Sequence, residues 1–265
     1  MPILIADDSV IKNPKFAPIF VPFNTVDGCM AAWRGDFASD LTGNENTLTK
    51  IGTPNQAKYA VSGDKSNGYR TSVKDGINRT LIVIHRQPSP VEAPNQAYNY
   101  PIGNLSQSAT NTGVGIGIIQ AAAVSSNINQ MSAIVGASKK DDPYFARAAP
   151  PSTPASNAMK WQWSAFVVDG SNNFAALYIP SQSGELVMAS KVSGVNLANR
   201  WVTNTDGSPS YYNICAWRDP SSPAAASTTI EVASAAFFDR PLLLSDLNAA
   251  YGFDTFWMAQ HGEVI

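Results

Sequence analysis

A strand pattern near the C-terminus, followed at once by a helical pattern, constrains this chain most. Residues 227–238 combine β-branched, small and aromatic side chains with the two-residue period of a strand. Residues 244–251 then predict one short helix that is capped by Ser245. The apolar face of this helix is formed by Leu244, Leu247 and Tyr251. We therefore expect a β-rich domain whose last strand leads into a single C-terminal helix.

Further strands are predicted upstream by apolar runs that end at turn residues. The strongest is 80–86, which is rich in β-branched residues, and weaker ones are 113–119 and 131–135. Residues 159–169 and 174–179 form a predicted hairpin around an Asp-Gly-Ser-Asn-Asn turn. Strands separated by turn signals over most of the chain predict an all-β, two-sheet antiparallel sandwich.

Three local motifs support this fold. They are the turn at 40–44, the tryptophan-led hairpin at 159–179, and a C-terminal set made of Arg240, Leu244, Ser245 and Asp246. In this order they resemble concanavalin A-like, LamG-type jelly-roll domains. The sequence departs from that pattern because two extra residues separate Arg240 from Leu244, and Asn248 replaces the usual acidic residue. The resemblance covers residues 29–251 and implies a jelly roll with one short C-terminal helix.

The chain divides into an arm and a domain. Residues 1–25 contain four prolines, namely Pro2, Pro14, Pro18 and Pro22, and follow no strand or helix period. They predict an extended arm that lies on the domain or on a partner and mediates assembly. Residues 26–265 form one predicted sandwich domain with long loops at about 87–111 and 139–160.

Charge and apolar pattern exclude several partners. The formal net charge is -2 and basic residues do not cluster, so we expect no nucleic acid to bind. No apolar run approaches the length of a membrane span, and the first residues lack the features of a signal peptide. Cys29 and Cys215 permit one disulfide, although two reduced thiols are the favoured interpretation.

Catalytic motifs are weak. Sandwich glucanases use two glutamates close together on one strand, and no two glutamates of this chain are close enough in sequence. Asp141 with Asp142, or Asp36 with Asp40, are the remaining acid pairs. His85 is interpreted as a polar residue at a strand end, outside any nucleophile motif. A glycan-active hydrolase is therefore an alternative that the sequence disfavours.

A calcium ion is one interpretation of the first turn region. Asp36, Asp40 and Asn44 offer oxygen ligands there, and LamG-like sandwiches often bind calcium at a loop edge. The competing interpretation is an Asx-type turn that satisfies its own backbone, and the sequence favours it.

Aromatic residues in the long loops are the candidates for ligand binding. Tyr98, Tyr100 and Tyr144 fall in the two predicted loops, where phenol rings can stack on sugar faces or fill a subunit interface. The tryptophans at 161, 163, 217 and 257 are expected in the core.

These features favour a non-catalytic, lectin-like module on a virus particle. The expected protein is a bacteriophage tail or fibre component, made in the host cytoplasm without a signal peptide, that attaches to a host-surface glycan. The arm would bind other virion proteins, and a homo-oligomer is expected. A structural virion protein with the same fold, such as a capsid decoration or tail-assembly subunit, is the alternative.

Overall fold

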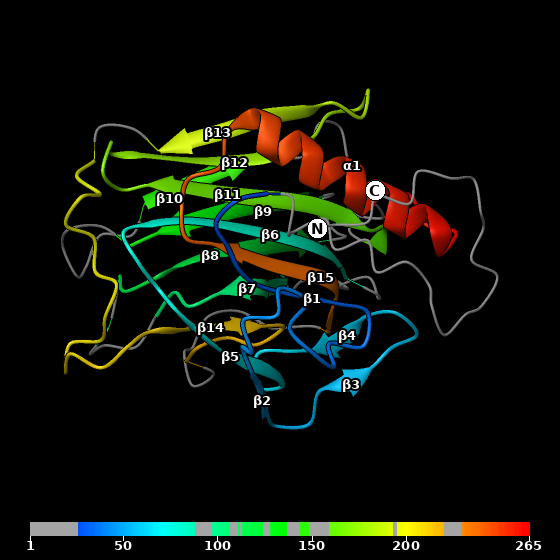
Figure 1. The fold of residues 1–265 in the computed structure, drawn as a ribbon, viewed down its shortest axis with the longest axis horizontal. Coiled ribbons are helices and arrows are strands. Elements are labelled where there is room, and N and C mark those ends of the chain that lie inside the picture. Colours follow the sequence, from blue (N-terminus) through cyan, green and yellow to red (C-terminus); the bar gives the residue numbers. More distant parts are fainter. Residues whose placement is uncertain are drawn as a thin grey trace, which may run out of the picture.

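The computed structural model describes residues 26–87, 97–106, 111, 113–123, 128–136, 144–148, 159–192, 195–219 and 229–265. Within these ranges the chain forms two antiparallel sheets and a C-terminal helix, α1 (Leu244–Gln260). Figure 1 shows α1 lying across the strands of the first sheet, while the short strands β2, β3 and β4 gather at the other end of the molecule. The predicted all-β sandwich with one C-terminal helix is confirmed.

The first sheet has eight strands, and its pairs are antiparallel. In spatial order they are β13 (Leu186–Val192), β12 (Phe174–Pro180), β11 (Gln162–Asp169), β6 (Asn78–Arg86), β15 (Ile230–Phe238), β4 (Val61–Gly63) and β3 (Asn55–Gln56), with β1 (Cys29–Arg34) also pairing with β15. The strands predicted at 80–86, 159–169, 174–179 and 227–238 therefore lie side by side, and the predicted hairpin is β11–β12.

The second sheet has seven strands, also paired antiparallel. In spatial order they are β10 (Tyr144–Ala148), β9 (Ile128–Val135), β8 (Ile116–Ala123), β7 (Ala97–Gly103), β14 (Tyr211–Ile214), β5 (Gly68–Lys74) and β2 (Leu48–Ile51). Chain crossovers such as the one from β1 to β2 join the two sheets at their edges.

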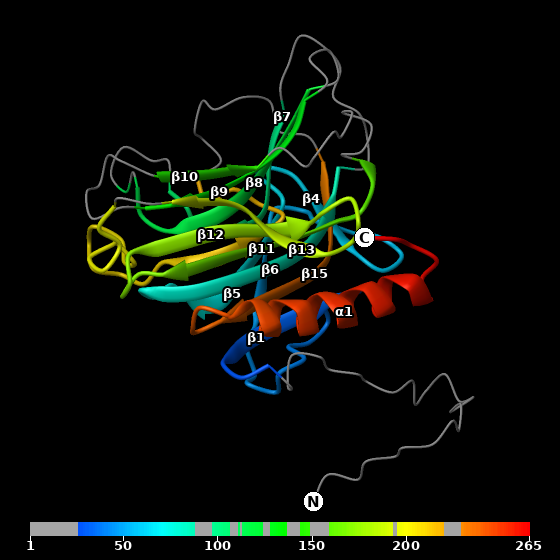
Figure 2. The ribbon, with the colours of Figure 1, turned by 90° about the horizontal axis from the view of Figure 1, so that it is seen from above.

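Two large buried clusters cover the two faces of the first sheet, and a smaller one, which contains Tyr100 and Trp217, packs on the second sheet. Between the sheets, alternate residues of the central strands form one buried cluster that includes Leu81, Val83, Ile118, Phe166 and Phe237. On the opposite face, α1 covers a second cluster that includes Ile82, Trp163, Phe238, Leu247 and Met258. Figure 2 shows β8, β9 and β10 of the second sheet on one side of β11 and β12, and α1 on the other side. Because both faces of β15 are covered, nearly every residue of that strand is buried.

The helix is longer than the sequence predicts, and its start differs. It begins after Leu243 and ends at Gln260, passing through Gly252, where the predicted helix stopped. A carboxylate caps the first turn of the helix: Asp246 Oδ2 accepts a hydrogen bond from Leu243 N at 3.3 Å. Ser245 is exposed and is not the N-cap, so that prediction is wrong.

The two predicted long loops each contain a strand. β7 lies inside the predicted loop 87–111 and β10 inside the predicted loop 139–160, so both loops are shorter than expected. Pro101 hid β7, because proline normally argues against a central strand. In the structure it lies at a register shift between Asn99 and Ile102, and its carbonyl accepts a hydrogen bond from Cys215 N at 3.1 Å.

Three further expectations concern the two cysteines, a membrane span and residues 1–25. Cys29 and Cys215 are both free thiols, as the favoured interpretation had it. Among the described residues, no helix combines the length and apolar character needed to cross a membrane. The predicted arm, residues 1–25, lies outside the described residues and stays a prediction.

Candidate functional site

The candidate site is built on the loop of residues 35–47, which joins β1 of the first sheet to β2 of the second. The loop makes a sharp exit from β1, because Gly35 has a φ of 68°. Two residues that are not glycine, Phe37 and Glu45, also adopt positive φ angles of 56° and 58°. Such backbone strain needs support from surrounding contacts and is frequent at binding sites.

Asp40 supplies that support from inside the loop. Its Oδ1 accepts hydrogen bonds from Ala32 N at 3.0 Å, Thr42 N at 3.0 Å and Thr42 Oγ1 at 2.8 Å. Its Oδ2 accepts hydrogen bonds from Asn46 N at 3.1 Å and Asn46 Nδ2 at 2.8 Å. Burial favours the neutral acid, but these donors outweigh it and lower the pKa of Asp40. The carboxylate therefore stays ionised and fixes the loop.

Two asparagines fasten the loop to the neighbouring strands. Asn44 Nδ2 donates to the Met30 carbonyl at 2.9 Å, and Asn46 Nδ2 donates to the same carbonyl at 2.8 Å. On the other sheet, Ser72 Oγ donates to Asn46 Oδ1 at 3.2 Å and accepts from Thr47 N at 3.0 Å. The loop is thus held from both sheets.

Aromatic side chains form the floor of the site. The ring of Phe37 stacks on that of Tyr69, with centroids 6.5 Å apart and planes at 24°. Trp33 lies deeper and meets Phe237 edge to face at 6.0 Å. Burial raises the pKa of Tyr69, so its hydroxyl stays protonated at neutral pH.

Above this floor the structure leaves a cavity of about 700 Å³. Its polar lining is exposed and mixed, with carboxylates from Asp36 and Glu45, an amide from Gln56 and an ammonium group from Lys50. The full lining is Trp33, Asp36, Phe37, Ala38, Ser39, Asp40, Gly43, Glu45, Asn46, Thr47, Leu48, Lys50, Gln56 and Tyr69. Such a volume is in the range of small-molecule sites.

The chemistry of the lining suits a neutral, hydroxyl-rich ligand. Each hydroxyl group is both a donor and an acceptor, so it can donate to a carboxylate or to the Gln56 amide oxygen and accept from the Lys50 ammonium group. An aromatic floor adds apolar contact for C–H groups. We call this cavity, with its loop and floor, the edge pocket.

The predicted calcium ligands lie at this place but serve another purpose. Asp36 and Asp40 line the edge pocket, whereas Asn44 is tied to the β1 backbone. Five N–H or O–H donors point at the Asp40 carboxylate, so a cation there would face hydrogen atoms. Asp36 Oδ1 accepts from Ala38 N at 3.0 Å, as in an Asx turn. Among the described residues, no group of His, Cys, Asp and Glu is arranged to hold a metal.

Of the three predicted ligand tyrosines, the structure describes the side chain of Tyr100 alone. Tyr100 is 5% exposed, and its ring packs against Trp217 with centroids 4.8 Å apart, so it belongs to the core of the second sheet. Burial raises its pKa. Its assignment as a loop ligand residue is therefore wrong. Tyr98 lies in β7 and Tyr144 begins β10, and their side chains lie outside the described residues.

The residues considered for catalysis do not form a catalytic arrangement within the described part of the chain. Asp141 and Asp142 lie outside the described residues. His85, expected at a polar strand end, is fully buried between the sheets, where its Nε2 lies 3.2 Å from Ser164 Oγ. Burial lowers its pKa to about 4. The neutral imidazole is part of the core.

Most of the edge pocket has no signal in the sequence. The turn at 36–44 is recognisable, but Lys50, Gln56 and Tyr69 come from three later strands, and only the folded sheets bring them together. The positive φ of Glu45 has no sequence signal, because residue 45 is not glycine, asparagine or aspartate.

No protein-family profile and no curated protein matches the chain. Solved structures do match. A botulinum neurotoxin type C structure, described for cell entry through two ganglioside molecules, is 13% identical with a TM-score of 0.59, covering 87% of this chain and 52% of that one. The botulinum neurotoxin DC binding domain in complex with SialylT is 12% identical, TM-score 0.57, covering 86% and 52%. The receptor-binding domain of botulinum neurotoxin D is 10% identical, TM-score 0.57, covering 86% and 53%.

These matches show a shared β-sandwich jelly roll. The chain spans about half the length of the domains that it resembles. The ganglioside and SialylT binding named in those structures belongs to the longer botulinum neurotoxin chains.

Proposed function

We propose that this protein is a non-catalytic, lectin-like module that binds a carbohydrate in the edge pocket. The observation that carries the proposal is a cavity of about 700 Å³ with an aromatic floor and a rim of exposed carboxylate, amide and ammonium groups. The fold is shared with domains named for ganglioside and SialylT binding, which supports a sugar as the ligand.

The state of the pocket acids supports a binding role over hydrolysis. A glycosidase needs one carboxylic acid with a raised pKa as proton donor. The pKa of Asp40 is lowered, and both of its oxygens hold the loop. Asp40 is therefore ionised and cannot serve as the proton donor of an Asp36–Asp40 pair.

The setting of the module on a virus particle is also part of the proposal. A surface with few charged residues, 14% of the chain, and a proline-containing arm favour a bacteriophage tail or fibre component that attaches to a host glycan. A structural virion subunit is the second candidate, because Leu244 and Phe256 of α1 expose apolar side chains that a neighbouring subunit could cover.

The test is binding to an array of neutral, sialylated and amino saccharides, followed by titration of the best ligand. The variants D36N and E45Q keep the size of each side chain and remove its charge. Each should weaken binding about tenfold, because a hydrogen bond to a charged group is lost. The matched control is E185Q, since Glu185 is exposed in the turn between β12 and β13, outside the pocket lining.

Thermal denaturation of each variant separates binding from folding. The proposal predicts unchanged melting for D36N and E45Q together with weaker binding. Binding by D36N and E45Q at the level of E185Q would remove the edge pocket as the site. Absence of binding to every saccharide on the array would favour the structural role.

A further inference from the structure

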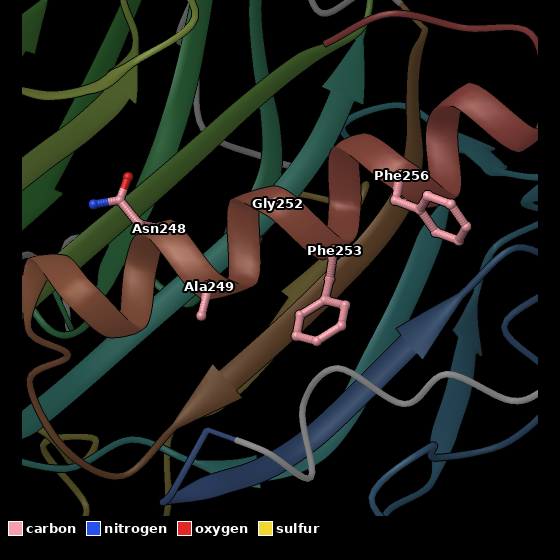
Figure 3. Close-up of a pocket in the computed structure, with 5 residues that line it drawn as sticks. All are labelled: Asn248, Ala249, Gly252, Phe253 and Phe256. Atoms are coloured by element: carbon pink, nitrogen blue, oxygen red, sulfur yellow. The ribbon is translucent and has the colours of Figure 1, made fainter. Parts of the chain in front are cut away.

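Helix α1 has a second, outward face that is apolar. Its inward face holds the buried residues Leu247, Ala250, Asp254 and Met258. On the outward side lies a groove of about 450 Å³, lined by Asn248, Ala249, Gly252, Phe253 and Phe256. Figure 3 shows the rings of Phe253 and Phe256 projecting from the same side of α1. Phe256 is 56% exposed, which is unusual for a phenylalanine in a folded helix.

Exposed apolar side chains also occur elsewhere on and near α1. Among the described residues, the large apolar side chains that are exposed belong to α1, its two flanks or β13, and they are Val187, Met188, Leu243, Leu244, Phe256 and Val264. β13 is the edge strand of the first sheet and lies in contact with α1. Two of these side chains, Leu244 and Phe256, belong to α1, and Phe256 lines the groove.

Gly252 keeps the groove open. A Cβ atom added there would meet no atom within 4 Å, so no packing constraint requires glycine. Its φ is not in the left-handed region, and glycine in a helix interior is less stable than alanine. The small residues Ala249 and Gly252 leave a hollow beside two phenylalanine rings, and that hollow fits an inserted side chain.

Residues 1–25 join the described chain next to this helix. Val26 is 5% exposed and belongs to the buried cluster that contains Leu242 and Leu247 at the start of α1. The next residue, Asp27, accepts a hydrogen bond from Arg240 Nε at 2.8 Å, just before the helix. The segment is therefore tethered at the N-terminal end of the groove.

The last part of this segment has the composition of a side-chain ligand. Residues 14–23 alternate prolines with large apolar residues, which are Phe16, Ile19, Phe20, Val21 and Phe23. An extended, proline-containing chain rises about 3.1 Å per residue, so ten residues span about 31 Å. A helix of 17 residues is about 26 Å long. The segment reaches along the whole groove.

We propose that residues 14–23 of this chain dock in the outward groove of α1 and insert an apolar side chain beside Gly252. Tethering at Val26 gives the segment a high effective concentration at the groove, which favours its own chain over a second copy. This inference is independent of carbohydrate binding. The sequence leaves open whether the arm lies on its own domain or on a partner, and the proposal places residues 14–23 on their own domain.

The test is hydrogen exchange of residues 15–23 in the full chain, compared with a free peptide of residues 1–25. Docking should slow exchange by about tenfold or more. The variant G252W fills the hollow and should return exchange to the peptide rate. The matched control G252A adds a single methyl group and should keep most of the protection.

A second pair of variants leaves the helix unchanged. F20S should lose protection, whereas I5S, outside the docked segment, should keep it. Exchange at the peptide rate in the unmodified chain would overturn the proposal. Protection that disappears on dilution, together with a dimer mass by light scattering, would also overturn it and assign the groove to a second copy.

Discussion

The edge pocket and the buried ion pairs both carry carboxylates, but their surroundings differ. Asp75 and Arg200 have side chains that are 0% exposed, and they meet through two hydrogen bonds of 3.0 and 2.6 Å. Asp254 is equally buried, paired with Arg34, and accepts from Trp163 Nε1 at 2.7 Å.

In the edge pocket, by contrast, Asp36 and Glu45 face solvent. The two surroundings give the acids different roles. A buried charge is stable only with partners, because removing it from water costs several kcal/mol. Asp75 and Asp254 therefore stabilise the fold through their arginine partners. A carboxylate at the rim of a cavity keeps its hydration and remains available to a ligand.

The largest expected effect follows from breaking a buried pair. D75A leaves the Arg200 guanidinium buried without its counter-charge and removes the acceptor of the Tyr212 hydroxyl. We expect a loss of about 3 to 5 kcal/mol in the free energy of unfolding, measured by urea denaturation.

A control separates charge from packing. The double variant D75L/R200M removes both charges and should recover part of the lost stability. A loss below about 1 kcal/mol for D75A would break the comparison, since the pair would then behave like a surface salt bridge.

The next effect is a pH dependence from His85. Its pKa is lowered to about 4 in the folded protein and is about 6.5 when unfolded. The unfolded state therefore binds more protons between these values. Stability is fully present above about pH 6.5 and falls toward pH 4, by up to about 3 kcal/mol.

The variant pair H85Q and H261Q sharpens this prediction. Urea denaturation from pH 7 to pH 4 should show a weaker pH dependence for H85Q than for the unmodified protein. H261Q alters the exposed histidine and should follow the unmodified protein. Identical profiles for all three proteins would mean that His85 is not buried in its neutral form.

The smallest expected effect belongs to a half-exposed pair. Arg240 Nη1 and Asp246 Oδ2 are 3.0 Å apart, with side chains 33% and 26% exposed. Asp246 also accepts from Leu243 N at the start of α1. D246A should lower the free energy of unfolding by about 0.5 to 1 kcal/mol. A loss comparable to that of D75A would contradict the distinction between buried and exposed carboxylates.

Much of the fold is predictable because periodicity reports burial. The runs at 80–86 and 174–179 mark β6 and β12, and the last strand and helix are also found. The misses are local conflicts that tertiary contacts override. Pro101 lies in a central strand because a register shift accommodates it. Gly252 does not end α1 because the residues beyond it pack on the first sheet.

The site is less predictable, because it depends on contacts between distant residues. The turn containing Asp36 and Asp40 is visible in the sequence, but whether its oxygens face a cation, the backbone or a cavity is decided by Asn46 and Thr42. Tyr100 shows the reverse error. It lies in a polar sequence, yet Trp217 buries it. Sequence polarity alone does not report exposure.

The most direct test of the account is the position of a bound saccharide. Amide chemical shifts are recorded during titration with the oligosaccharide that binds best on the array. We expect shifts in residues 36–47 and at Tyr69, with the signals around Asp75 and Asp254 unchanged. Shifts confined to other parts of the molecule, with the loop unaffected, would contradict the assignment of the edge pocket as the carbohydrate site.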